Sequence, residues 1–531
     1  MAVHKLRKEA GPIGLLYASL GGMIGSGWLF GSLHAAKMAG PLSIWSWVIG
    51  AIAVLLLALV YSELVTMMPK SGALVHISHL SHGDMLGRIW GWILFLGYVS
   101  IAPVEVMAVL TYTNNYLPGM IQPQTGLLTH LGFVIAILSL ALIVALNLLA
   151  IRWVLWINSA VTWWKIAIPV LTIFILLMYS YHPENMHAAP GAYEFSGIFT
   201  AVASAGVIFS FLGFRQAIDL AGETANPHRN IPLAVIGSVI IAAIIYIGLQ
   251  YAFLLAIDPS DIGNSWRTLH FTGVFGPLAA LSVGVGATWW AVVLYADAIA
   301  SPAGTGFIYS TASSRITMAA GEMRTLPQSL AEVNAKGVPV RALVVTFVAG
   351  AIFFFPFPSW QKLVSYISSV TVLSYGLGPI VLLHLRRVAP DSRRSFRLWW
   401  AWLLAPMAFI ISNWIILWTG FDTGNVLFSM IGAMFVIYTL YHYFVQGKQG
   451  GPFGWKLIIW IFPYFIGLWL LLYFGPTALG GNNTLSFGLD MLLSAIFSLL
   501  IMLLALATGV PADASKDYLA QLTSEGEEAA P

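Results

Sequence analysis

Long runs of apolar residues alternate with short polar segments along almost the whole chain. A helix needs about 20 consecutive, mostly apolar residues to cross the hydrocarbon core of a bilayer. Fourteen such windows can be placed in succession, and no segment between them is long enough to form a soluble domain. The windows are residues 12–36, 42–67, 87–117, 131–149, 153–181, 197–220, 231–257, 276–311, 340–355, 360–385, 398–419, 426–445, 455–474 and 487–508. The pattern predicts an all-α polytopic membrane protein with about 14 transmembrane helices.

The composition supports this class and excludes several others. Hydrophobic residues make up 59% of the chain and charged residues 8%, whereas about 25% of residues in a soluble domain are charged. The net charge of +3 is too small to predict binding to nucleic acid. Because the chain has no cysteine, disulfides, thiolate catalysis and cysteine-ligated metals are excluded. We expect no metal site and no enzymatic activity, and the sequence leaves the oligomeric state open.

The distribution of Lys and Arg predicts the orientation, because cytoplasmic loops of membrane proteins carry an excess of both. We place the N-terminus in the cytoplasm and let the windows alternate in direction. Three basic residues then fall on the outer side and two fall within windows: Lys37, Arg267 and Lys362, and Lys165 and Arg215, respectively. We therefore expect a multi-pass protein of the cell membrane, plasma or inner, with both termini in the cytoplasm.

The first window contains an unusual run of glycines, Gly21-Gly22-Met23-Ile24-Gly25-Ser26-Gly27, at membrane mid-depth. Glycine is a poor helix former, so the run favours a local break in the helix. Unwound backbone at this depth is tolerated only where it is buried in protein or lines a polar cavity. Its free N–H groups suit a carboxylate, and its free carbonyls suit a cation or an ammonium group. Close packing of helices through small residues is the alternative.

A companion break is expected in the sixth window, which contains Phe209-Ser210-Phe211-Leu212-Gly213-Phe214-Arg215. This segment has one glycine, but it also carries Arg215, and a charged residue inside a membrane span is by default a functional candidate. The spacing of Gly25 and Gly213 fits two halves of five spans each. Such halves would be related as inverted repeats, with a binding site where the two broken helices meet.

Three motifs occur in matching order along the chain. They are the glycine run of residues 21–27, the segment from Ser62-Glu63-Leu64 to Pro69-Lys70-Ser71-Gly72, and Ala221-Gly222-Glu223-Thr224-Ala225-Asn226-Pro227-His228-Arg229-Asn230-Ile231-Pro232. Together they resemble the amino acid–polyamine–organocation (APC) permeases, over roughly the first ten to twelve windows. The last two windows extend beyond the common twelve-span form of that family, and we expect them to be peripheral.

The resemblance implies the LeuT-like fold, in which two inverted repeats of five helices surround a central site and helices 1 and 6 are discontinuous. It also implies transport by alternating access. The expected organisation is a cytoplasmic N-terminus (1–11), a first repeat (12–181), a second repeat (197–385), two further spans (398–445), two extra spans (455–508) and a cytoplasmic tail (511–531). The polar composition of the tail predicts disorder.

The resemblance further implies which backbone groups bind the head group of an amino acid. Amides near the first break would hold the α-carboxylate, at Gly25, Ser26 and Gly27. Carbonyls would receive the α-ammonium, at Met23 or Ile24 in the first window and at Phe209, Ser210 or Leu212 in the sixth. Phe209 also stands where family members often place an aromatic gate over the substrate.

Arg215 departs from the family pattern, because this position is commonly acidic in APC permeases. A guanidinium group facing the cavity offers a bidentate partner for a second carboxylate. This points to aspartate or glutamate as the substrate and resembles the bacterial aspartate:proton symporters of the family. The alternative is an internal ion pair with Asp219, which lies four residues later on the same helix face.

Two further ionisable residues are candidates for proton coupling. Lys165 stands where proton-coupled relatives place an ammonium group in the position of a sodium ion beside the first broken helix. Burial disfavours the charged form of a lysine, so that a buried lysine can exchange its proton. Snorkelling of Lys165 to the cytoplasmic interface is the alternative. Glu105 lies deep in the third window and is either a second proton carrier or a structural partner.

The sequence therefore predicts a secondary active transporter that carries an acidic amino acid together with protons, with no other cofactor. Moving one negative charge into a cell costs about 2.3 kcal/mol per 100 mV, and one co-transported proton cancels that cost. The alternatives are an amino acid exchanger, a permease for neutral amino acids with Arg215 locked to Asp219, and a non-transporting nutrient sensor. The expected partners are the amino acid and the lipid bilayer.

Overall fold

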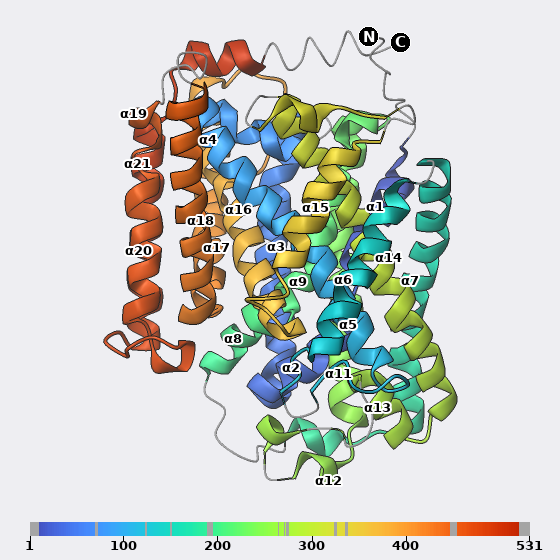
Figure 1. Ribbon diagram of the computed structural model, residues 1–531. Helices are drawn as coiled ribbons and strands as arrows, with labels where there is room; N and C mark the ends of the chain where they lie inside the picture. Colours follow the sequence, from blue (N-terminus) through green and yellow to red (C-terminus); the bar gives the residue numbers. More distant parts are fainter. Residues whose placement is uncertain are drawn as a thin grey trace.

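The computed structural model describes residues 10–69, 73–122, 125–148, 151–187, 195–263, 265–269, 271, 276–322, 326–334, 338–446 and 454–519. All regular secondary structure in these ranges is helical, apart from two isolated β-bridges. Eleven helices, or helices joined end to end, are long and apolar enough to cross a membrane, and a bent pair of helices is a twelfth. The chain is thus an all-α, multi-pass membrane protein, as predicted (Figure 1).

The first half of the chain contains a helix, or two consecutive helices, in each of the first five predicted windows. These are α1 (Pro12–Met23), α2 (Gly27–Ala39), α3 (Ser43–Met67), α4 (Ala73–Val99), α5 (Ile101–Thr113), α6 (His130–Ala145) and α7 (Ile151–Tyr179). The third predicted window begins too late, because α4 starts at Ala73. A kink at His82 and Gly83 divides α4, and Gly83 has a φ of +70° there.

The next five predicted windows also contain helices, several of them interrupted. These are α8 (Ser196–Ser204), α9 (Val207–Phe211), η4 (Leu212–Arg215), α10 (Gln216–Asp219), α11 (Pro227–Ala256), α13 (Pro277–Gly284), α14 (Thr288–Glu322), α15 (Val340–Ile352) and α16 (Trp360–Val388). Short helices connect these elements: η1 (Gly40–Leu42), η2 (Leu146–Leu148), η3 (Pro183–Met186), η5 (Ala221–Glu223), α12 (Pro259–Ile262), η6 (Trp266–Thr268) and η7 (Gln328–Ala331).

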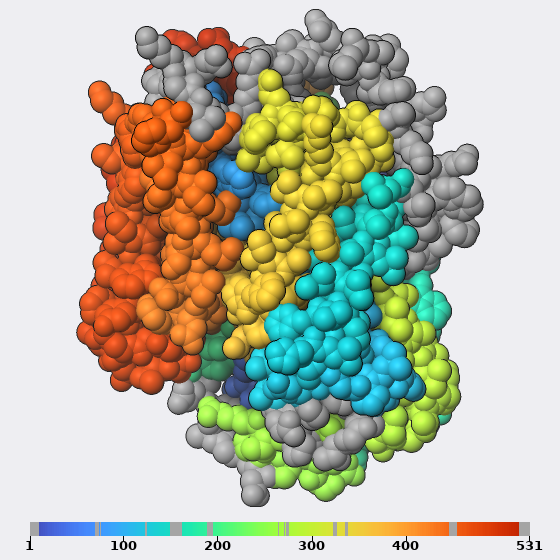
Figure 2. Space-filling model, in the orientation of Figure 1, coloured from blue at the N-terminus to red at the C-terminus, as the bar shows by residue number. Residues whose placement is uncertain are grey.

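The last helices pack on one side of the bundle. They are α17 (Ala401–Trp418), α18 (Phe421–Tyr441), η8 (His442–Gln446), α19 (Trp455–Ile458), α20 (Ile461–Phe474), η10 (Thr477–Leu479) and α21 (Phe487–Thr508). Figure 1 shows α18, α20 and α21 along one flank, with α17 between them and α16. Figure 2 shows a hollow between α18 and α15, with α4 at its floor.

Burial distinguishes a central group of helices from this flank. In the most apolar stretches of the α4–α5 segment and of α16, 94% of the residues are buried, against 22% in α18 and 28% in α21. α1 lies inside the bundle, where it packs against α11, α7 and η4. A functional site is therefore expected around α1, because its neighbours exclude both lipid and water from its interrupted backbone.

Part of the C-terminal tail is ordered, contrary to the expected disorder. Residues 512–519 form a short helix that lies against the beginning of α4. The hydroxyl group of Ser515 donates to the carbonyl of Leu80 at 2.8 Å and contacts His384 at 3.3 Å. The sequence misjudged this segment because its contacts are with residues far away in the chain. Residues 520–531 lie outside the described part of the tail.

A buried ionic network joins the end of α3 to the end of α16. Glu63 is fully buried, and its carboxylate accepts from Arg386 at 3.0 and 2.6 Å and from the N–H of Leu398 at 2.7 Å. Arg394 forms a further ion pair with Glu63 at 3.2 Å. These two arginines therefore satisfy a carboxylate within the protein.

We expect Glu63→Ala to lower the stability of the protein by about 3–5 kcal/mol, because it leaves two buried or partly buried guanidinium groups without their anion. Thermal unfolding of the purified protein in detergent measures the effect. Glu332→Ala is the matched control, since Glu332 pairs with Arg341 at 2.8 Å on the exposed surface and should contribute about 0–1 kcal/mol. Equal unfolding temperatures for the two variants would contradict a stabilising role for the network.

Candidate functional site

The first helix is interrupted within the glycine run, as the sequence predicts. α1 ends at Met23 and α2 begins at Gly27, and Ile24 has backbone angles of −84° and 81° that lie outside the helical region. Ile24 and Ser26 are fully buried. The N–H of Gly25 turns back to the carbonyl of Met23 at 3.0 Å. The interruption therefore leaves polar backbone groups in the interior of the bundle, where each needs a partner.

The second interruption lies earlier than the sequence suggests. α8 and α9 meet at an angle of 50°, and Gly206 between them has a φ of +94°, a conformation that favours glycine. Gly213, the expected position, lies instead in the short helix η4. It packs so closely on α1 that a methyl group there would overlap backbone atoms of Gly22 and Met23. Close packing and unwinding thus occur in the same window, at different glycines.

The N–H of Ser26 has a protein carboxylate as its partner. It donates to Oε2 of Glu105, from α5, at 2.9 Å. Glu105 is fully buried, and its other oxygen, Oε1, has no hydrogen-bond partner among the described residues. Glu105 thus occupies one of the amides that the resemblance assigns to the carboxylate of the substrate. Gly25, Gly27 and their neighbours leave no room for a larger residue.

The carbonyl groups expected to bind an ammonium group accept from hydroxyl groups of distant helices. Tyr246 of α11 donates to the carbonyls of Met23 at 3.1 Å and of Ser210 at 3.3 Å, and so bridges the two broken segments. The carbonyl of Leu212 accepts from Tyr375 of α16 at 3.4 Å. These bonds satisfy three of the carbonyl groups without a ligand.

Lys165 lies inside the bundle, beside the first break. Its side chain is 1% exposed, and Nζ donates to the carbonyl of Gly21 at 2.8 Å and to the hydroxyl of Thr305 at 2.7 Å. Thr305, from α14, also lies 3.5 Å from the carbonyl of Ile24. The ammonium group therefore does not snorkel to the surface. It contacts the backbone of α1, as the resemblance to proton-coupled permeases implies.

Arg215 is fully buried, and its guanidinium group is enclosed by three tyrosine rings. The guanidinium carbon lies 3.6, 4.9 and 5.9 Å from the ring centres of Tyr98, Tyr309 and Tyr375, respectively. None of its three nitrogens has a hydrogen-bond acceptor among the described residues. The rings supply cation–π attraction, but they leave every N–H of the guanidinium group without a partner.

Asp219 does not form the internal ion pair that the spacing of four residues suggests. Its carboxylate accepts from the hydroxyl of Tyr98, and no ion pair links it to Arg215 within the described part of the chain. Tyr98 therefore separates the two charges, with its ring face toward Arg215 and its hydroxyl toward Asp219.

Another buried carboxylate, that of Asp297 on α14, accepts from Ser301 at 2.7 Å.

An aromatic cluster covers the site on the side of α2. Trp360, at the start of α16, donates its indole N–H to the hydroxyl of Ser26 at 2.8 Å. Its ring lies 4.7 Å from that of Phe30 and 6.3 Å, edge to face, from that of Phe209. His34 stacks on the indole at 5.5 Å. Phe209 therefore belongs to a larger aromatic cover rather than standing alone.

Three residues of this site were missed by the sequence analysis, namely Tyr246, Thr305 and Trp360. A tyrosine, a threonine and a tryptophan are common in membrane helices, so none of them stands out by type. Their partners lie 223, 284 and 334 residues away, and no local spacing records such contacts. A charged residue next to one of them in the sequence would have been needed to identify it as a candidate.

Comparison with known proteins identifies the family. A sequence model of the family described as amino acid permease matches residues 11–466. The chain belongs to the amino acid permease family. Its match to the glutamate/serine transporter AimA of Bacillus subtilis (strain 168) is 36% identical and covers 97% of this chain and 96% of the relative. The aspartate-proton symporter of the same organism is 32% identical over 95% of this chain and 97% of that protein.

These relatives are transporters and not enzymes. This amino acid permease is therefore a transport protein of the APC superfamily, and its substrate is a small molecule of the amino acid class. A more distant relative, the branched-chain amino acid permease BcaP of the same organism, is 25% identical over 82% of this chain and 93% of its own length. The family model ends inside α20, whereas the two closer matches cover nearly the whole chain.

Gly213→Ala should destabilise the permease by about 1–3 kcal/mol, because the new methyl group forces α1 and η4 apart in a packed interior. Gly14→Ala is the control, since it adds a methyl group to α1 in open space. Thermal unfolding of both purified variants provides the comparison. If Gly213→Ala unfolds at the same temperature as Gly14→Ala, the close approach of the two broken segments is wrong.

Proposed function

We propose that this permease is a secondary active transporter that imports aspartate or glutamate together with protons, by alternating access. The names of two relatives support this substrate class, since one gives glutamate and serine and the other gives aspartate and a proton. The observation that carries the proposal is the guanidinium group of Arg215, which is fully buried without a hydrogen-bond acceptor among the described residues.

A buried guanidinium group without acceptors is costly, because its hydration is lost and its N–H groups gain nothing in return. The side-chain carboxylate of an acidic substrate would supply the missing acceptors in a bidentate pair. Arg215 is also close to the first break. Tyr309, which contacts Arg215, and Thr305, which contacts Lys165, are one turn apart on α14, about 6 Å along the helix. One small amino acid could therefore reach both.

The contact between Glu105 and Ser26 supports a coupling mechanism. The amide that would hold the α-carboxylate of the substrate is occupied by Glu105. Two carboxylates cannot share one N–H, so the substrate competes with Glu105 for Ser26. A proton taken up by Glu105 neutralises its charge and weakens its bond to the amide. Substrate binding and protonation of Glu105 then favour each other, as symport requires.

Lys165 would supply the second proton-linked group in this mechanism. Its ammonium group donates to the carbonyl of Gly21 and to Thr305, so the loss of its proton would weaken its attachment to the end of α1. At least one co-transported proton cancels the cost of about 2.3 kcal/mol per 100 mV for importing an anion. A second proton makes the import electrically downhill. Protons are thus the only coupling ion that the proposal requires.

The proposal includes the topology. We infer fourteen spans, formed when α1 with α2 and α8 with α10 each count as one broken span and α15 crosses as a short helix. The first ten would form two inverted repeats of five, with both termini in the cytoplasm of a cell-membrane protein. In that orientation the aromatic cover of Trp360 faces outward, and the tyrosines around Arg215 lie toward the cytoplasm.

Exchange of amino acids, or transport of a neutral amino acid, is the second candidate. The name of the glutamate/serine transporter favours it, because serine has no side-chain carboxylate for Arg215. A nutrient sensor would bind the same amino acids without moving them. Uptake of labelled aspartate and serine into proteoliposomes, with and without an imposed pH gradient, separates these functions. Accumulation of aspartate that depends on the gradient supports proton symport.

Arg215→Gln should raise the KM for aspartate by about 10- to 100-fold, because it removes a charge-assisted hydrogen bond to the substrate. Arg341→Gln is the control, since Arg341 is exposed, pairs with Glu332 at 2.8 Å and donates to the carbonyl of Ser329 at 3.3 Å, away from the site. Initial rates of uptake into proteoliposomes give the KM values, and thermal unfolding checks the fold. An unchanged KM in a folded Arg215→Gln variant would remove the acidic-substrate hypothesis.

Glu105→Gln should abolish the response of uptake to an imposed pH gradient, because the amide side chain cannot release a proton at any working pH. Exchange of labelled against unlabelled aspartate should persist in the variant, since exchange needs no net proton movement. Lys165→Ala should show the same separation. Glu332→Gln, on the exposed surface, serves as the control. A full response to the gradient in both buried variants would place the coupling site elsewhere.

A further inference from the structure

A cavity outside the transport site lies between α4, α18 and α20. Its volume is about 340 Å³, and twelve residues line it, nearly all of them apolar. The side chains of Ile89, Ile458 and Ile461 form its buried floor, and it opens beside the exposed residues Gly432 and Ile466. These exposed residues lie on the flank of the helix bundle, which faces the lipid in a membrane protein.

The lining determines what kind of molecule the cavity can hold. The polar side chains in it are the hydroxyl of Ser429 and the indole of Trp469, and the indole N–H already donates to Asn425 at 3.0 Å. Water needs two to four polar partners, and apolar cavities of this kind stay dry and bind apolar ligands. The cavity therefore suits a hydrocarbon chain.

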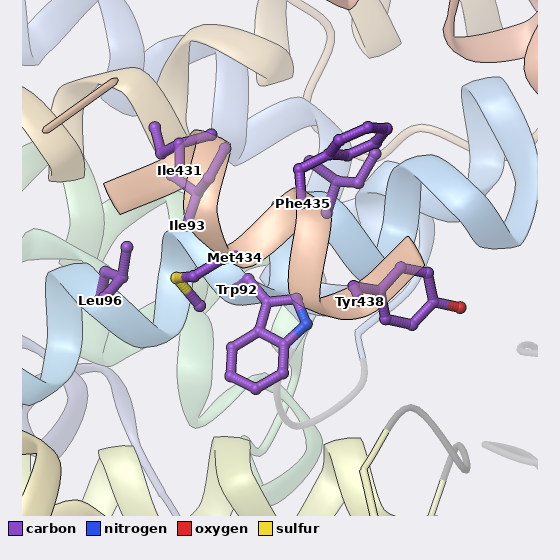
Figure 3. A pocket seen from close by; sticks show the side chains of 8 residues that line it. Trp92, Ile93, Leu96, Ile431, Met434, Phe435 and Tyr438 are labelled. Carbon is purple, nitrogen blue, oxygen red and sulfur yellow. The ribbon is translucent and has the colours of Figure 1, made fainter. Parts of the chain in front are cut away.

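A smaller cavity next to it has a different character. It is about 20 Å³ in volume and shares Ile89, Ile431 and Phe435 with the larger one (Figure 3). That volume is enough for about one water molecule and too small for a chain. Trp92 also lines this smaller cavity, and its buried indole N–H has no acceptor among the described residues. The hydrocarbon chain is thus assigned to the larger cavity alone.

Basic residues lie at one end of the larger cavity. Arg88 directly precedes Ile89 of the floor, and Lys456 lies two residues before Ile458. Arg88 donates to the hydroxyl of Tyr438 at 2.5 Å, and within the described ranges no carboxylate lies within ion-pair distance of Arg88 or Lys456. Asp84, four residues before Arg88 on α4, interacts with Arg88 electrostatically, but its direct ion-pair partner is His79 at 3.1 Å. Two cations without a direct ion pair beside an apolar cavity complement a molecule with an anionic head and a hydrocarbon tail.

The distance from the basic end to the far end of the cavity fits one leaflet of a bilayer. On α18 the lining runs from Phe428 to Phe435, about 10 Å along the helix, and Tyr438, which contacts Arg88, lies about 15 Å from Phe428. This is half of the hydrocarbon thickness of about 30 Å. A lipid tail that starts at the basic end would therefore reach the middle of the membrane.

We propose that this cavity binds one anionic phospholipid, with an acyl chain between α18 and α20 and its phosphate at Arg88 and Lys456. The proposed topology places the site in the inner leaflet, and in this respect alone the proposal rests on the proposed function. The helix α20, which the family resemblance treats as a peripheral addition, then forms one wall of a lipid site.

Gly432 provides the critical variant, because a side chain added there would meet no atom within 4 Å and would enter the cavity. Gly432→Phe should fill the space that the acyl chain occupies. Gly488→Phe is the matched control, since Gly488 of α21 also faces open space and does not line the cavity. Ser429→Phe is a second filling variant, to be used if Gly432→Phe fails to fold.

Native mass spectrometry of the purified full chain, titrated with phosphatidylglycerol or with phosphatidylcholine of the same chains, measures binding. We expect one tightly bound phosphatidylglycerol, held roughly tenfold more tightly than phosphatidylcholine. The double variant Arg88→Gln, Lys456→Gln should lose this preference, and Gly432→Phe should lose both lipids, while Gly488→Phe behaves as the unmodified chain.

Binding to Gly432→Phe that equals binding to the unmodified chain would overturn the proposal. So would a dimer of the unmodified chain that Gly432→Phe converts to a monomer, because the occupant would then be a second copy. A tight site without preference for the anionic lipid would overturn the role of the two basic residues. None of these readings depends on aspartate uptake, so the lipid site and the transport function fail or stand separately.

Discussion

The structure depends on how three residues of unwound backbone are satisfied in the interior of a membrane protein. Between Met23 and Gly27 the helix is absent, and at this depth no water replaces the missing hydrogen bonds. The partners come from other helices: Glu105 for the N–H of Ser26, and Tyr246 for the carbonyl of Met23. The surrounding bundle therefore supplies the partners that stabilise the break.

The buried charges follow from the same constraint. Lys165 is stabilised because it donates to backbone and hydroxyl oxygens, and Glu105 because it accepts from an amide. Asp219 accepts from Tyr98. Arg215 differs from all of these, since its neighbours offer aromatic faces and no acceptor within the described residues. A buried charged group without hydrogen-bond acceptors can bind a ligand reversibly, whereas a charged group in an ion pair with the protein stabilises the fold.

Much of the architecture could be read from the sequence, because length and apolar character decide whether a segment spans a bilayer. The break at Ile24 was also predictable, since a run of glycines weakens a helix wherever it occurs. The second break was misplaced by several residues. The helix bends at Gly206, whereas Gly213 allows close packing against α1. From the sequence alone, a single glycine in a helix does not show which of these two roles it has.

The remaining parts of the site could not be predicted, because they depend on contacts between distant segments. Tyr246 bridges the two breaks, and Trp360 covers them, yet both residue types are common in membrane helices. The order in residues 512–519 arises in the same way, since Ser515 bonds to Leu80 and His384. The sequence marked Arg215, Lys165 and Glu105 as candidates because a charged residue inside a membrane span is costly, and the structure places all three in the buried interior.

The competition between substrate and Glu105 for the amide of Ser26 is tested most directly by a structure of the permease with aspartate bound. We expect the α-carboxylate of aspartate at the N–H of Ser26, with Glu105 displaced from it and the side-chain carboxylate paired with Arg215. A structure in which Glu105 still accepts from Ser26 while aspartate lies elsewhere would contradict this mechanism.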